Sequence, residues 1–174
     1  MADLNGKSVA IIATNGFEDS ELTSPKEAVE SAGATTKVLS TETGEIEGKK
    51  GAKVAVDAKT ADASADEFDA LILPGGTVNA DTIRTDADAV ALVKAFKDAG
   101  KPISVICHGG WILADADVLK GVTLTSVANV KTDLANAGAN WVDEEVVVDS
   151  GFISSRTPDD LPAFNATLVE EFAK

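Results

Sequence analysis

Cys107 and His108 are the only cysteine and the only histidine of the chain, and they are adjacent. An apolar run at residues 103–106 precedes them, and two glycines at 109–110 separate them from a second apolar run at 111–114. This pattern predicts a strand, a sharp turn and a helix, with the thiol on the turn, which is the arrangement of a nucleophile elbow. A lone cysteine is usually a small buried hydrophobic residue, but here we expect a reactive thiol whose pKa is lowered by the helix N-terminus.

The residues around this turn indicate how a reaction would be assisted. His108 is the candidate base, and its backbone amide, directly after the nucleophile, is a candidate oxyanion donor. Gly75 and Gly76 end another predicted strand and would add further amides, because glycine lets the backbone approach a substrate closely. We also expect Gly109 to bind substrate with them. The alternative for the Pro-Gly-Gly sequence is a tight exit from a strand.

Glu18 is the candidate acidic residue, since it follows the first predicted strand. A carboxyl group at this position would hydrogen-bond the thiol and tune its pKa, or carry a proton during the reaction. The alternative is an ordinary charge in the first turn of a helix. We expect Asp19 and Glu21 to be such ordinary charges.

The elements that must position these residues alternate between buried strands and helices. Strands are predicted at residues 7–13, 36–40, 69–73, 102–106 and 122–126, a hairpin or loop excursion at 44–60, and a hairpin at 146–154. Helices are predicted at residues 24–32, 86–99, 133–137 and from 158 onward. The first helix has an alternative start near Glu18, which makes Pro25 a kink. Apolar strands separated by helices predict an α/β fold with a mainly parallel sheet.

Three segments that carry the candidate residues, 15–19, 74–76 and 107–110, each follow a predicted strand. In a parallel α/β sheet, the site lies at the carboxyl ends of the strands. We therefore expect these three segments to converge on one site.

Composition limits the class of protein. The chain has 174 residues, of which 44% are hydrophobic, and it is expected to form one domain over residues 1–174. Its net charge of −14 argues against nucleic-acid binding and against docking on anionic membranes. A single cysteine forms no internal disulfide and suits a reducing compartment. With neither an apolar leader nor an apolar run of about 18 residues, we expect a cytoplasmic protein.

No cofactor and no metal are expected from the motifs. One cysteine and one histidine, side by side, cannot supply the three or four convergent ligands of a zinc site. Neither a Walker motif nor a dinucleotide-binding glycine motif occurs. Trp111 and Trp141 are expected in the core or at an interface rather than as platforms for a substrate.

The chain resembles the ThiJ/PfpI family, within the glutamine-amidotransferase-like superfamily, over nearly its whole length. The resemblance is carried by residues 11–22 (IIATNGFEDSEL), 70–76 (ALILPGG), 105–111 (VICHGGW), 132–148 (TDLANAGANWVDEEVVV) and 154–161 (SSRTPDDL). The likeness is greatest to the PfpI-type branch, whose members are described variously as intracellular proteases, general stress proteins, and deglycases or glyoxalases.

This resemblance implies a flavodoxin-like three-layer sandwich and an assembly of dimers or hexamers. The family's cysteine falls on Cys107, its glutamate on Glu18 and its histidine on His108. The family's oxyanion amides fall on Gly75 and Gly76, together with the amide after the cysteine. In the family, the glutamate is thought to carry the proton that hydrogen-bonds the thiolate or a sulfinate formed from it.

Three departures from the family pattern weaken an assignment as a peptidase. PfpI-type peptidases place an acid of a neighbouring subunit against the histidine. Here the corresponding residue is Asp81, which is aspartate rather than glutamate and is shifted by one position. Val127 stands where a tyrosine is expected, and Gly110 stands where the family usually has proline.

The leading prediction is an enzyme that acts on glyoxal, methylglyoxal or their protein adducts, as a deglycase or glyoxalase, with Cys107 attacking the carbonyl carbon. One alternative is a PfpI-type intracellular cysteine peptidase. The other is a redox-sensing or chaperone-like stress protein that uses oxidation of Cys107 as a switch. The expected partners are a small carbonyl substrate or a glycated protein, and further copies of the chain in a homodimer or higher oligomer.

Overall fold

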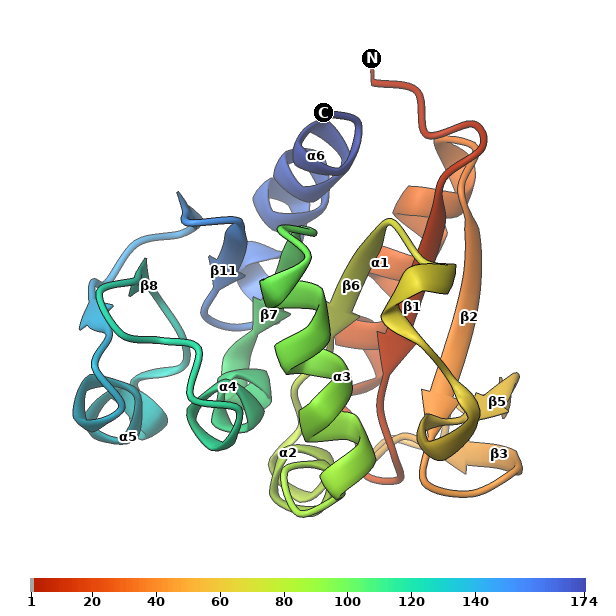
Figure 1. Cartoon of the computed structure of the whole chain (residues 1–174), viewed down its shortest axis with the longest axis horizontal. Helices are drawn as coiled ribbons and strands as arrows, with labels where there is room; N and C mark the ends of the chain where they lie inside the picture. The colour runs from red at the N-terminus through yellow and green to blue at the C-terminus, as the bar shows by residue number, and fades with distance from the viewer. Residues whose placement is uncertain (1) are drawn as a thin grey trace.

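A seven-stranded sheet forms the centre of the computed structural model, which describes residues 2–174 (Figure 1). The strand order is β10-β11-β7-β6-β1-β2-β5, and all neighbouring strands run parallel except β10 and β11. These strands are β1 (Ser8–Ile12), β2 (Thr35–Ser40), β5 (Ala58–Lys59), β6 (Ala70–Leu73), β7 (Ile103–Ile106), β10 (Val147–Asp149) and β11 (Phe152–Ser155). Two small sheets lie outside it: the hairpin of β3 (Gly44–Glu47) and β4 (Lys53–Val56), and the pair of β8 (Thr123–Leu124) and β9 (Asn140–Trp141).

Helices cover both faces of the central sheet (Figure 1). One face is covered by α1 (Asp19–Ser31) and α6 (Leu161–Phe172). The other is covered by α2 (Thr77–Ile83), α3 (Ala87–Asp98) and α4 (Trp111–Asp115), with α5 (Lys131–Asn136) next to α4. The protein is therefore a three-layer α/β sandwich with a mainly parallel sheet, as predicted.

The two inner strands β1 and β6 are apolar from Val9 and from Ala70 onward because both of their faces are buried. In β1, Val9 and Ile11 belong to the core under α1 and α6, whereas Ala10 and Ile12 belong to the core under α3 and α4. Successive side chains of a strand point to opposite faces of a sheet. A strand covered by helices on both sides therefore has no polar alternation, which confirms the interpretation of these runs as buried strands.

The first helix begins earlier than its capping pattern predicts. Residues 24–27 have the spacing of a capping box, but α1 starts at Asp19, so the alternative, earlier start is right. Pro25 lies inside the helix, where it removes one backbone donor. Instead of capping a helix, the Ser24 hydroxyl accepts a hydrogen bond of 2.7 Å from Nδ2 of Asn165 in α6. Packing of α1 along α6 thus outweighs the local signal.

Three further elements differ from the predictions. α2 and β5 were not predicted, because seven and two residues are too few to show an apolar period. The strand predicted at 122–126 is reduced to β8, which pairs with β9 outside the central sheet. Both predicted hairpins, β3 with β4 and β10 with β11, are present.

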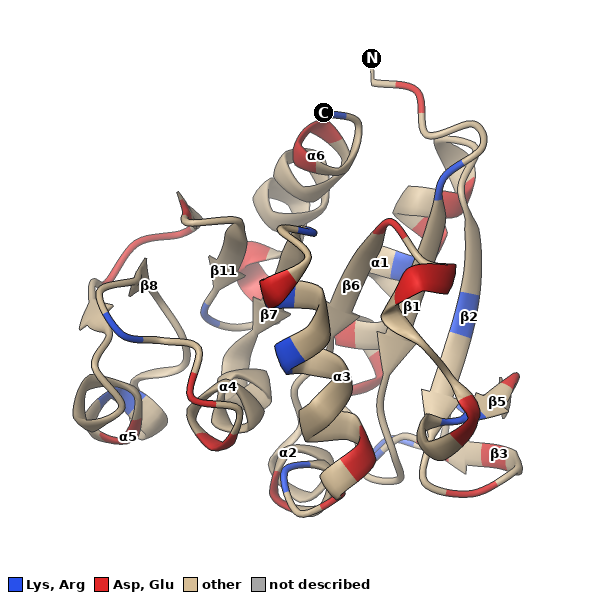
Figure 2. Ribbon diagram, in the orientation of Figure 1, with Lys and Arg blue, Asp and Glu red and all other residues tan. Residues whose placement is uncertain are grey.

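The acidic residues are distributed over helices and loops, with lysine and arginine between them (Figure 2). The net charge of −14 is therefore not concentrated on one element. Among residues 2–174, no helix is both long enough and apolar enough to cross a membrane.

Gly109→Ala is expected to destabilise the fold more than the neighbouring Gly110→Ala. A methyl group at Gly109 would lie 2.8 Å from Leu73 O and 2.9 Å from Pro74 O, whereas at Gly110 the nearest atom is a side-chain carbon of Leu134 at 3.2 Å. Backbone oxygens at the end of β6 cannot move aside as a leucine side chain can, so we expect a cost of about 1–3 kcal/mol at Gly109. That corresponds to a melting temperature lower by about 2–4 °C per kcal/mol. Differential scanning fluorimetry checks this, and equal melting temperatures for the two variants would contradict it.

Candidate functional site

Cys107 follows β7 and begins a 3-10 turn at residues 107–110 that continues into α4. Its φ is 60°, in the left-handed region that residues other than glycine rarely adopt. Backbone strain of this kind persists only where the surroundings enforce it, and it clusters at functional sites. Here β6 and β11 hold β7 on both sides. The turn therefore has the strained geometry expected of a nucleophile elbow.

The segments that follow β1, β6 and β7 meet at the carboxyl ends of these strands, as predicted. Glu18 N donates a hydrogen bond of 3.2 Å to Gly75 O, which joins the first two segments. A methyl group added at Gly75 would lie 2.8 Å from Cβ of Cys107, and one added at Gly109 would lie 2.9 Å from Pro74 O, so the second segment is packed directly against the third. One site is thus assembled from three distant parts of the sequence.

The ring of His108 lies against the thiol. Its Nδ1 is 3.3 Å from Sγ of Cys107, and its Nε2 is 3.4 Å from Oγ1 of Thr77. Burial, followed by the charge of Lys49, lowers the pKa of His108. The ring is therefore neutral at neutral pH, with one nitrogen able to accept a proton. Trp111, expected only in the core or at an interface, supports the ring edge-on, with 5.4 Å between the ring centroids.

Glu21, and not Glu18, carries the carboxyl group beside the thiol. Its side chain is 0% exposed and lies against Cys107 next to Gly75. Oε1 accepts a hydrogen bond of 3.0 Å from Gly75 N, whereas Oε2 is buried without a donor among the described residues. Burial, followed by the charge of Glu18, raises the pKa of Glu21 to about 7. A carboxyl group that is about half protonated at neutral pH therefore sits beside the sulfur.

Glu18 is instead paired with two lysines of the turn between β3 and β4. Nζ of Lys49 contacts Oε2, and Nζ of Lys50 lies 3.0 Å from Oε1. Burial acts to raise the pKa of Glu18, but the hydrogen bonds and charges of the two lysines outweigh it, and the pKa is lowered. The expectation that Glu18 is the acid of the thiol is thereby corrected.

The start of α1 explains this exchange of roles. Glu18 is the N-cap residue and lies outside the helix, whereas Glu21 lies in its first turn. The buried face of α1 contains Glu21, Leu22, Pro25 and Val29, and residues four and eight positions apart lie on one side of a helix. A helix that starts near residue 18, the alternative in the sequence, places Glu21 on this apolar face and is the signal that identifies it.

Asp19 also differs from the ordinary charge that was expected. Its carboxylate accepts hydrogen bonds from Lys50 N at 3.0 Å and from Ala52 N at 2.9 Å. Lys49 N donates to Phe17 O at 2.9 Å. These three hydrogen bonds therefore hold the turn that carries both lysines against the segment that follows β1.

The thiol and the carboxyl group of Glu21 titrate as a coupled pair. Burial, followed by the charge of Glu21, raises the pKa of Cys107 to about 12, while the amides of His108 and Gly76 act in the opposite direction. The expectation of a lowered thiol pKa is therefore wrong. When Glu21 takes up a proton, the repulsion disappears and an O–H donor faces the sulfur. The protonation of Glu21 thus governs how readily the thiolate forms.

The three glycines expected to bind substrate have different roles. The N–H of Gly75 is already taken by Glu21, and Gly109 serves close packing against the carbonyls at the end of β6. The amides of Gly76 and His108 face the sulfur and act to lower its pKa, so these two are the candidate oxyanion donors of the site. Gly76 must be glycine, because its φ is 93° and an added methyl group would meet backbone atoms of the segment after β1.

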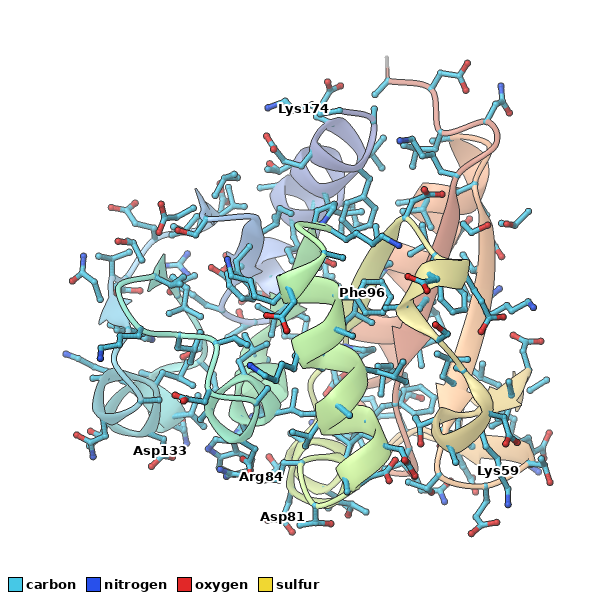
Figure 3. All side chains as sticks on the ribbon, viewed as in Figure 1. Lys59, Asp81, Arg84, Phe96, Asp133 and Lys174 are labelled. Atoms are coloured by element: carbon cyan, nitrogen blue, oxygen red, sulfur yellow. The ribbon has the colours of Figure 1, made fainter. Side chains whose placement is uncertain are left out.

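Asp81 does not reach His108 within one protomer. It is an exposed residue of α2, and Nε2 of His108 faces Thr77 instead. Figure 3 shows Asp81 at the outer edge of the molecule, near Arg84. A contact between Asp81 and the histidine requires another copy of the chain, so the role of Asp81 across subunits stays a prediction.

The groups that gather here suit nucleophilic addition. Within residues 2–174, no three His, Cys, Asp or Glu side chains come together as a metal site requires. A thiol, a neutral imidazole, a proton-carrying carboxyl group and the two amides that face the sulfur do come together. That set fits the attack of sulfur on an electrophilic carbon, with negative charge developing on an adjacent oxygen.

Comparison with known proteins assigns the chain to a family. The sequence pattern of the DJ-1/PfpI family matches residues 7–171. The chain is 52% identical over 168 residues to an uncharacterized protein of Staphylococcus saprophyticus, and the match covers 95% of this chain and 97% of that protein. The chain therefore belongs to the DJ-1/PfpI family, which confirms the resemblance to ThiJ/PfpI proteins.

Solved structures show the same fold. A two-domain protein of Anabaena variabilis, with DJ-1/ThiJ/PfpI-like and ferritin-like domains, is 34% identical with a TM-score of 0.92 over 94% of this chain. The chain spans 49% of that longer protein. A ThiJ/PfpI domain protein of Brachyspira murdochii is 29% identical with a TM-score of 0.89, and the match covers 98% of this chain and 97% of that one.

Glu21→Gln is expected to speed the reaction of Cys107 with iodoacetamide at pH values above the pKa of Glu21. Glutamine keeps the shape of the side chain, removes its charge and offers an N–H to the sulfur, so the thiol pKa falls. A fall of half a unit to one unit gives a rate about three to ten times higher at a fixed pH. Below the pKa of Glu21 the gain shrinks, because the wild-type carboxyl group is then already neutral. Intact-mass kinetics measure these rates.

The matched control is Glu18→Gln, three residues away. It removes a carboxylate that is held by Lys49 and Lys50 rather than by the thiol site, so its effect on the alkylation rate is expected to be the smaller one. A larger effect of Glu18→Gln than of Glu21→Gln would return the role of thiol partner to Glu18.

Proposed function

We propose that this protein is a cysteine-dependent enzyme that acts on small reactive carbonyls such as glyoxal and methylglyoxal, or on their protein adducts, as a glyoxalase or deglycase. The observation that supports the proposal is the buried pair of Glu21 and Cys107, beside the neutral ring of His108. Carbonyl addition needs a nucleophile that gives up a proton and a group that delivers one to the developing oxyanion. Cys107 is the nucleophile, the neutral ring of His108 can accept its proton, and the carboxyl group of Glu21 can deliver a proton to the oxyanion.

In the first step, the thiol of Cys107 gives its proton to Nδ1 of His108, its sulfur forms a bond to the aldehyde carbon, and the electron pair of the carbonyl moves onto the carbonyl oxygen. The amides of Gly76 and His108 stabilise this oxyanion. The carboxyl group of Glu21 then donates its proton to the oxygen. The product of this step is a hemithioacetal.

In the following steps, the hydrogen on the former aldehyde carbon leaves as a proton to the Glu21 carboxylate. Its electron pair forms a double bond to the adjacent carbon, whose ketone oxygen gains the proton held by His108, which gives an enediol. Glu21 then returns a proton to that adjacent carbon while the hydroxyl group on the sulfur-bearing carbon loses its proton to His108, which gives the thioester of a 2-hydroxy acid. Hydrolysis breaks the carbon–sulfur bond, restores the thiol and releases the acid, so the sum adds one water to the 2-oxoaldehyde.

Purified protein is expected to convert methylglyoxal to lactate, and Cys107→Ser is expected to abolish the conversion. Glu21→Gln is expected to lower turnover at least about a hundredfold, since it removes a general acid, although the same change speeds alkylation. Proton NMR of the product in a buffer free of amines measures this, because amines bind small carbonyls reversibly and imitate deglycation. Consumption of methylglyoxal without formation of lactate would contradict the proposal.

A second candidate function is redox sensing through Cys107. A sulfur that faces two amide donors and a protonated carboxyl group is well placed to be held as a sulfinate after oxidation. With a single cysteine in the chain, no internal disulfide intercepts the oxidation. Oxidation of Cys107 would therefore inactivate the enzyme and, in a sensor, would be the event that is detected.

Mild peroxide is expected to add two oxygen atoms at Cys107 and to stop there, with turnover of methylglyoxal falling in proportion. A titration that follows intact mass, turnover and suppression of aggregation of a client protein separates the two functions. If the reduced protein has no turnover and client protection rises with oxidation, the sensor is favoured and the carbonyl enzyme is contradicted.

The peptidase alternative has less support from the site. It requires Asp81 of one subunit to meet His108 of another, and Thr77 occupies the neighbourhood of Nε2 within the protomer. Assembly into a homodimer or higher oligomer is part of our proposal, on the ground of the family resemblance.

A further inference from the structure

Asn79 is a buried polar residue next to the site that the sequence patterns did not single out. It lies in α2 and is 0% exposed. Its Oδ1 accepts a hydrogen bond of 2.7 Å from Thr14 N. Its Nδ2 donates to Pro74 O at 3.2 Å and to Gly75 O at 3.0 Å. One carboxamide therefore connects the segment after β1 with the segment after β6.

These hydrogen bonds act on peptide groups whose N–H groups belong to the site. In a planar trans peptide, the carbonyl and the N–H point in opposite directions. The Pro74 carbonyl is bonded to Asn79, so the Gly75 N–H points the other way, to Oε1 of Glu21 at 3.0 Å. The Gly75 carbonyl is also bonded to Asn79, so the Gly76 N–H faces the thiol. One side chain thus orients two consecutive peptides.

The two glycines need such an external restraint. Glycine has access to far more backbone conformations than other residues, and Gly76 adopts a φ of 93°. A peptide between two glycines can rotate at little steric cost, and rotation would turn its N–H away from the thiol. Glu18 N also donates to Gly75 O, but only Asn79 bonds both carbonyls.

We propose that Asn79 is a positioning residue of the thiol site, whose carboxamide holds residues 74–76 so that one peptide N–H binds Glu21 and the next faces Cys107. A carboxamide is suited to this task because it donates twice and accepts in the same plane. An apolar side chain of similar size would leave the Thr14 N–H and the Pro74 carbonyl unpaired and would take one of two hydrogen bonds from the Gly75 carbonyl. The inference rests on the proposed function in taking Cys107 as the reactive group.

The test compares Asn79→Asp and Asn79→Ser with the wild type in the rate of alkylation of Cys107 by iodoacetamide across the pH range. Aspartate keeps the size and accepts from Thr14 N, but cannot donate to either carbonyl. Serine is neutral and donates only one hydrogen bond, so it separates loss of donors from added charge. We expect both variants to react at least about threefold more slowly at a fixed pH, which corresponds to a thiol pKa higher by half a unit.

The matched control is Asn136→Asp, the same chemical change at an exposed position of α5, and it is expected to alkylate like the wild type. A merely structural role of Asn79 would lower the melting temperature but leave the alkylation rates and their pH profile unchanged in the folded protein. That result in both variants would overturn the proposal. If Asn79→Asp does not fold, Asn79→Ser decides.

If neither variant folds, NMR of the wild type decides. The amide of Gly76 and the side-chain amide of Asn79 are then expected to shift together as the pair of Glu21 and Cys107 titrates, and constant shifts would overturn the proposal. None of these measurements needs turnover. Absence of lactate formation would therefore defeat the proposed function alone, whereas unchanged alkylation would defeat the role of Asn79 alone.

Discussion

A fully buried carboxyl group beside a half-buried thiol cannot carry a negative charge at the same time as the sulfur without a large cost. Removing either charge from water is unfavourable, and two like charges in contact repel each other strongly in a medium of low polarity. Glu21 receives only one backbone hydrogen bond, from Gly75, and its other oxygen has no donor among the described residues. With a pKa of about 7 for Glu21 and about 12 for Cys107, the thiol keeps its proton near neutral pH while the carboxyl group gains or loses one, so the pair does not carry two negative charges there. This coupling between the two titrating groups is the feature around which the site is built.

The fold supplies the remaining parts from fixed positions. The thiol lies on a turn with a positive φ that β7 and its neighbours enforce. The carboxyl group comes from the first turn of α1, and the amide that faces the sulfur comes from the segment after β6. Because all three follow the carboxyl ends of adjacent parallel strands, their spacing is set by the sheet rather than by a mobile loop. This is how a site of charged and strained groups stays in place inside a well-packed sandwich.

The sequence predicted those parts whose signal is local. The apolar runs, the elbow at Cys107 and the glycines at 75 and 76 are visible in short windows, and the structure has all of them. The start of α1 was not predictable from its capping pattern, because contacts with α6 outweigh the local preference at Ser24 and Pro25. The predicted and observed starts of α1 differ by about one and a half turns. The observed start puts Glu21 on the buried face of the helix and leaves Glu18 outside it as the N-cap. Asn79 gave no signal, since a buried asparagine acts through backbone groups that no sequence pattern reveals.

Glu18 and Glu21 show how one fold gives opposite properties to two carboxyl groups three residues apart. The two lysines of the β3–β4 turn lower the pKa of Glu18, whereas burial raises that of Glu21. Enzymes that use a proton at neutral pH depend on such divergent environments. The charge of Glu18 adds to the raised pKa of Glu21, whereas the charge of Lys49 acts against it, so the turn and its partner Glu18 shift this pKa in opposite directions. The turn between β3 and β4 therefore takes part in the chemistry through charge, although it supplies neither the nucleophile nor the base.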